Sequence, residues 1–143
     1  MKRYIPLLYG CFPFVFGWLS QWLTGTTTST FLLSLFVSTT LFLIAWWFIG
    51  YACGKLKTGI LLPTVLANLP LALALILFSV LSIRTALPDF IVSICDMGVL
   101  SVSGIMLGAS FTTENLLVAC IISLIPVVAV FWLGCTKSSP RSK

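Results

Sequence analysis

The chain has 143 residues, of which 59% are hydrophobic and only 8% are charged, and its mean hydropathy is +1.16. About a quarter of the residues in a soluble globular domain are charged, so this composition excludes that class and predicts an all-α integral membrane protein. Lysines and arginines at the cytoplasmic ends of spans account for the net charge of +5, so no nucleic-acid partner is expected.

Five apolar stretches follow one another with short polar connections. We expect a single transmembrane domain over residues 1–143, built as a small bundle of five transmembrane helices with a basic, disordered tail. The expected spans are residues 4–23, 31–51, 59–83, 90–111 and 115–134, and the tail is 136–143. No small-residue cleavage site follows the first stretch, so it is interpreted as a span rather than a signal peptide. Pro13 predicts a kink within it.

Aromatic residues and lysines mark the end of the second span. Trp46, Trp47 and Tyr51 come shortly before Lys55 and Lys57, a pattern typical of a cytoplasmic boundary. The first residues of the chain are basic as well. We therefore expect a cytoplasmic N-terminus and a location in the plasma (inner) membrane.

Two G-x-x-x-G patterns predict faces on which helices pack closely. The first pairs Gly50 with Gly54, and the second pairs Gly104 with Gly108. Small residues at this spacing let two backbones approach each other inside a membrane. Gly54 is equally suited to cap the end of the second span, so its role stays open.

Two polar side chains inside spans are the candidate intramembrane site. Asn68 lies beside Pro70, and a broken helix with a polar side chain is how some transporters bind a ligand; a hydrogen bond from Asn68 to a neighbouring helix is the alternative. If the fourth span begins at Phe90, Asp96 lies about 9 Å inside it at 1.5 Å per residue. Ionisable groups at such a depth are costly and usually face protein or water.

The stretch 88–111 has two possible arrangements. It is long enough to span, but its glycines and serines also suit a re-entrant segment that enters and leaves on one side, which would give four spans instead of five. With five spans, the eight basic residues divide four against four. With four spans and a re-entrant segment, they divide seven against one, as the positive-inside rule favours.

No catalytic or metal-binding pattern is present in the sequence. It contains no histidine, and its five cysteines include no C-x-x-C pair, so neither a metal site nor a cofactor is expected. The acidic residues are Asp89, Asp96 and Glu114. Glu114 suits the first turn of the last helix, with the hydroxyl of Thr112 or Thr113 as its N-cap. The sequence therefore does not predict an enzyme.

Two functions fit these features. The first is an accessory or structural subunit that packs against a larger membrane complex, and the second is an oligomeric transporter or channel component for a small solute or cation. The short connections and glycine patterns favour the subunit, whereas Asp96 and Asn68 favour transport. In both cases the expected partners are the lipid bilayer and either a membrane protein or further copies of the chain.

Overall fold

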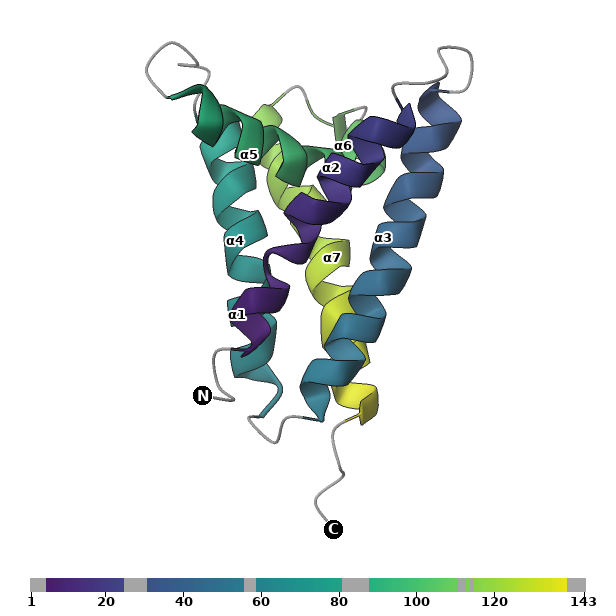
Figure 1. The fold of residues 1–143 in the computed structure, drawn as a ribbon, viewed down its shortest axis with the longest axis vertical. Coiled ribbons are helices and arrows are strands. Elements are labelled where there is room, and N and C mark those ends of the chain that lie inside the picture. Colours follow the sequence, from purple (N-terminus) through teal and green to yellow (C-terminus); the bar gives the residue numbers. More distant parts are fainter. Residues whose placement is uncertain are drawn as a thin grey trace.

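The chain folds into a bundle of helices. Figure 1 shows a computed structural model, which describes residues 5–24, 31–55, 59–80, 88–110, 113 and 115–138. Within these ranges every regular element is an α-helix and none is a strand, which confirms the all-α prediction. The helices are α1 (Ile5–Tyr9), α2 (Phe12–Thr24), α3 (Phe31–Gly54), α4 (Leu61–Val80), α5 (Asp89–Ser101), α6 (Ser103–Ser110) and α7 (Leu116–Ser138).

Three of the described helices are long and apolar enough to cross a membrane. They cover Leu33–Gly54, Leu61–Ser79 and Leu116–Ser138. Helices α5 and α6 pass the same test as a pair, but they meet at 79°, so the number of candidate spans is three or four. The predicted five spans are not confirmed. The first apolar stretch forms two helices of 5 and 13 residues, each shorter than the roughly 20 residues of a span.

Proline explains where the first apolar stretch breaks. Pro13 has no N–H to donate to the carbonyl of Tyr9, and α1 ends at Tyr9. The amide of Gly10 then donates to the carbonyls of Pro6 and Leu7, at 3.1 and 3.0 Å, which closes the last turn of α1. The kink predicted at Pro13 is therefore a full break one turn earlier in the chain.

The helices are arranged around a parallel pair. In Figure 1, α3 and α7 begin at the upper end and end at the lower end, α4 runs in the opposite direction, and α2 rises toward the start of α3. Helices α5 and α6 lie at the upper end. The start of α1 and the end of α7 are both at the lower end. The largest side chains of the buried apolar core are those of Phe42, Trp46, Leu71, Leu75, Val102, Val127 and Phe131.

The ends of α7 differ from the expected ones. Asn115 caps the helix, because its Oδ1 accepts a hydrogen bond of 3.0 Å from the amide of Leu117, while Thr113 Oγ1 accepts from the amide of Asn115. Thr112 and Glu114 lie outside the described residues. At the other end α7 continues to Ser138, so the first three residues of the predicted tail are helical. The remainder of the tail lies outside the described residues.

Candidate functional site

Asn68 joins two helices at the centre of the bundle. It lies in α4, two residues before Pro70, and is only 5% exposed. Its Oδ1 accepts a hydrogen bond of 3.2 Å from the indole Nε1 of Trp46 in α3, and its Nδ2 donates to the carbonyl of Thr64 at 2.8 Å. A buried amide needs such partners, and these contacts use both its donor and its acceptor group. Asn68 therefore links α4 to α3.

Aromatic rings from three helices surround this hydrogen bond. Trp46 is fully buried, and its ring lies 6.1 Å from that of Phe12 in α2, 5.7 Å from that of Phe42 and 5.1 Å from that of Phe131 in α7. Trp46, predicted among the aromatics of a membrane boundary, does not face the outside of the bundle. The polar contact lies instead in an apolar interior, where a hydrogen bond is strengthened by the low dielectric.

Asp96 lies on a different helix from Asn68. It is half-buried in α5, next to the buried Cys95. On its other side, Met97 lies where α5 approaches α2 most closely, because a Cβ at Gly17 would meet the Met97 carbonyl. The two residues of the predicted polar site thus belong to separate contacts, Asn68 between α4 and α3 and Asp96 beside the contact of α5 with α2.

The bend between α5 and α6 at Val102 is held by local and distant contacts. Val102 is fully buried, and the hydroxyls of Ser101 and Ser103 donate to the carbonyls three residues before them, at 2.7 and 2.9 Å. The amide of Gly104, at the start of α6, donates to Thr39 Oγ1 of α3 at 2.9 Å. The side chain of Thr39 thus satisfies a backbone group that the first turn of a helix leaves without a partner.

Glycines bring α3 and α7 into backbone contact. A Cβ at Gly50 would meet the carbonyl of Phe131, and one at Gly54 would meet the carbonyl of Cys135. Gly134 lies on the facing side, where a Cβ would meet the carbonyl of Trp47. Gly50 and Gly54 could be predicted from their G-x-x-x-G spacing, whereas Gly134 could not, since no second glycine stands four residues from it.

The second glycine pair divides between the interior and the surface. Gly104 is buried, and a Cβ there would lie 2.8 Å from Thr39 Oγ1 and 3.1 Å from the carbonyl oxygen of Leu35. Gly108 is exposed, and a Cβ there would meet nothing within 4 Å. Of this pair, only Gly108 is accessible to another molecule.

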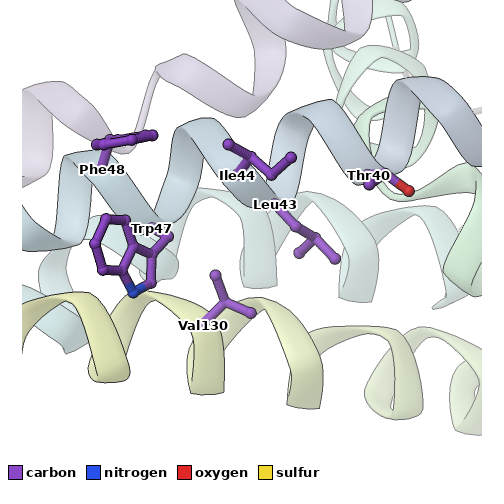
Figure 2. A pocket seen from close by; sticks show the side chains of 6 residues that line it. All are labelled: Thr40, Leu43, Ile44, Trp47, Phe48 and Val130. Carbon is purple, nitrogen blue, oxygen red and sulfur yellow. The ribbon is translucent and has the colours of Figure 1, made fainter.

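An apolar hollow lies on the outside of the α3–α7 pair. This outer groove has a volume of about 420 Å³ and is lined by Thr40, Leu43, Ile44, Trp47, Phe48 and Val130. Figure 2 shows Leu43 and Trp47 pointing from α3 toward α7, with Val130 pointing back. The one lining hydroxyl, on Thr40, donates to the Phe36 carbonyl at 2.8 Å. The outer groove therefore presents hydrocarbon to whatever enters it.

The acidic and cysteine side chains are dispersed among the described residues. No three of them in this part of the chain form a group that could hold a metal ion. The buried thiol of Cys135 donates to the carbonyl of Gly50 at 3.1 Å, a contact between α7 and α3. This cysteine thus contributes to packing of the helix pair.

Hydrogen bonds between helices and an apolar outer groove are the main features of the described structure. Within the described residues, polar groups from distant parts of the sequence meet at the helix contacts, and the outer groove is apolar. Comparisons of the chain with protein-family models, with curated proteins and with solved structures give no match.

Proposed function

We propose that this chain is a multi-pass membrane protein that acts as a non-catalytic accessory or structural subunit of a larger membrane complex. The observation that carries the proposal is that buried polar groups of the chain form hydrogen bonds between its own helices. Asn68 bonds to Trp46, the amide of Gly104 bonds to Thr39, and the hydroxyls of Ser20 and Ser38 lie 2.6 Å apart between α2 and α3. Each contact fastens one helix to another, as expected of a rigid packing unit.

The distribution of charge supports one orientation. Lys55 follows α3 and Lys137 lies in the last turn of α7, so both belong to the lower end in Figure 1. Five more basic residues adjoin this end in the sequence, and only Arg84 falls between α4 and α5. By the positive-inside rule we assign this end to the cytoplasmic side of the plasma membrane. The chain then crosses four times, through α1 and α2 together, α3, α4 and α7, and α5–α6 is a re-entrant segment.

Reporter fusions test this orientation. Green fluorescent protein fused after residue 143 is expected to fluoresce, and alkaline phosphatase fused at the same point is expected to be inactive. Five crossings would place the C-terminus outside if the N-terminus is cytoplasmic. An active phosphatase with a dark fluorescent fusion would therefore refute the re-entrant arrangement.

The exposed side of α6 is the surface we assign to the larger partner. Gly108 is open there, next to a hollow of about 250 Å³ formed with α3 and α5. The hollow is lined by Leu35, Val99, Ser103, Met106, Leu107 and Ser110. A glycine beside a shallow depression allows a partner helix to approach the backbone closely.

Purification from the native membrane tests the assignment. The tagged chain is extracted in a mild detergent, and proteins that co-purify in stoichiometric amount are identified. Gly108→Leu is expected to lose such a partner without loss of folding, because the site has room for the side chain. Ala129→Leu, on the exposed side of α7, is the matched control and is expected to keep it. A partner retained equally by both variants would exclude the α6 surface, and a chain that purifies alone would refute the subunit role.

Transport is the second candidate, favoured by the two broken helices. Helices α2 and α5 come into close contact at Gly17 and Met97, and Asp96 lies beside this contact. Discontinuous helices with an ionisable group near the break are used by transporters to bind ions. If this function is correct, Asp96→Asn abolishes cation-dependent flux in vesicles that contain the purified chain. Unchanged flux, or no flux in the parent protein, would remove this candidate.

A further inference from the structure

The outer groove continues toward a cationic end of the molecule through stacked aromatic rings. The Trp47 ring lies 5.7 Å from the ring of Tyr51 at an interplanar angle of 20°, and Lys55 Nζ lies 4.6 Å from the centroid of Tyr51. Trp47 is at the same time a wall of the outer groove. A continuous path therefore joins the hydrocarbon-lined hollow to an ammonium group.

A second lysine lies at the same end. A Cβ at Gly54 would meet both the Cys135 carbonyl and the Ser138 hydroxyl, so the ends of α3 and α7 are in contact. Lys137 is exposed in this last turn of α7, and Lys55 is exposed one residue after α3. The two cations thus flank one helix junction, and each is placed favourably against the negative end of a helix dipole.

The two acidic residues that the structure describes belong to the other end of the fold. Asp89 and Asp96 are in α5, and Glu114 precedes α7 in the sequence. Helix α5 and the start of α7 lie at the upper end in Figure 1, opposite the lysines. An anion that approaches Lys55 and Lys137 therefore meets no carboxylate among the described residues of this end.

The distance from the lysines to the groove matches the depth of one membrane leaflet. At 1.5 Å per residue, Phe48 and Thr40 lie roughly 10 and 23 Å along the helix from Lys55. Half of a hydrocarbon core is about 15 Å thick. An amphiphile whose anionic group rests at the lysines would thus have an alkyl chain beside Phe48, Trp47 and Ile44.

From this geometry we propose that the chain binds one anionic glycerophospholipid at the α3–α7 pair. The phosphate headgroup lies at Lys55 and Lys137, and one acyl chain follows Tyr51 and Trp47 into the outer groove. Charge complementarity favours an anionic phospholipid over a zwitterionic one, and the hydrocarbon lining of the groove favours an alkyl chain. The site is separate from the α6 surface assigned to a protein partner, and it requires neither the subunit role nor transport.

The test uses the full-length chain in nanodiscs that contain equal amounts of dioleoyl phosphatidylglycerol and dioleoyl phosphatidylcholine. Because both leaflets then contain both lipids, the result does not depend on orientation in the cell. Native mass spectrometry after release from the nanodisc measures which lipid stays bound. One retained phosphatidylglycerol is expected, with a preference of about 30-fold over phosphatidylcholine, or roughly fivefold from each lysine, which corresponds to about 1 kcal/mol per basic residue.

Charge variants test the headgroup half of the site. Lys55→Gln combined with Lys137→Gln is expected to remove the preference, whereas Arg84→Gln, which removes one charge between α4 and α5, is expected to leave it unchanged. Equal retention of the two lipids by the parent protein would overturn the proposal. An undiminished preference in the double variant would do so as well.

Groove variants test the acyl-chain half of the site. Ile44 is 51% exposed and lines the outer groove, whereas Ile125 is 63% exposed and lines a separate apolar hollow of about 450 Å³ on α7. Ile44→Trp and Ile125→Trp are therefore matched substitutions that distinguish the outer groove from an apolar hollow outside the proposed site. Only Ile44→Trp is expected to lower the retained phosphatidylglycerol, by tenfold or more. Phe48→Ala removes a wall of the groove at a 60% exposed position and should act in the same direction if Ile44→Trp does not fold. The assignment would be overturned if a folded groove variant retained as much phosphatidylglycerol as the parent protein. It would also be overturned if the variant lost a bound protein rather than the lipid.

Discussion

Adding one methyl group at Gly134 should have the opposite effect on stability to adding it at Gly108. At Gly134 the new Cβ would overlap the Trp47 carbonyl oxygen and lie 2.9 Å from the Tyr51 nitrogen and 3.2 Å from the Gly50 carbonyl carbon. All three atoms belong to the backbone of α3, so none can turn aside as a side chain could. The helices must separate, and overpacking of this kind costs about 1–3 kcal/mol.

At Gly108 the same methyl group meets nothing within 4 Å. Alanine there gains helix propensity, up to about 1 kcal/mol over glycine, so Gly108→Ala should be neutral or stabilising. The two variants are thus expected to differ by about 1–4 kcal/mol in the free energy of unfolding. Reversible unfolding in mixed dodecyl maltoside and dodecyl sulfate micelles, followed by circular dichroism, measures the difference. If Gly134→Ala were as stable as the parent, the close contact of α3 with α7 would be refuted.

Further predictions concern other helix contacts and use the same unfolding assay. Trp46→Phe and Asn68→Leu should be non-additive by about 0.6–1.7 kcal/mol in a double-mutant cycle, the range for hydrogen bonds between membrane helices, and strict additivity would contradict the bond. Thr39→Val should destabilise by about 1 kcal/mol, because it leaves the Gly104 amide without its acceptor, and an unchanged stability would show that the bend does not need it. Gly17→Ala should destabilise by about 1–3 kcal/mol through the Met97 backbone, and a stabilising effect would contradict the contact of α2 with α5.

The long helices could be predicted from the sequence because lipid and protein interiors impose the same requirement for apolar side chains. The expected stretches 31–51, 59–83 and 115–134 correspond to α3, α4 and α7. Most of the helix ends that the structure describes lie within a few residues of the predicted ones. The breaks were harder to place. Pro13 indicated the first break, one turn from where it occurs. Val102 carries no signal of its own, and the hydrogen bond next to its bend is accepted by Thr39, which is distant in the sequence.

The residues that contact each other across helices, such as Asn68 and Trp46, could not be predicted from the sequence. Asn68 stands out as a polar residue in an apolar stretch, yet α3 is apolar on all sides, so nothing in its pattern distinguishes the buried Trp46 from the exposed Phe48. In a soluble protein the polar face of a helix would provide that information. In a membrane protein both faces are apolar, and the orientation of each helix is set by contacts that only the folded chain supplies.

The bend at Val102 is relevant to how the basic residues divide between the two sides of the membrane, as well as to the fold. A re-entrant segment is stable in a membrane only where protein shields its backbone. The contacts at this bend provide such shielding: Val102 is fully buried, Gly104 bonds to Thr39, and Gly17 lies against Met97. A span here, straight or bent, would divide the basic residues evenly, whereas a re-entrant segment would divide them seven to one, so the bend fits the proposed orientation without requiring it. In the proposed arrangement α5 and α6 form this re-entrant pair, and Asp96 lies in the half of the bundle away from the lysines.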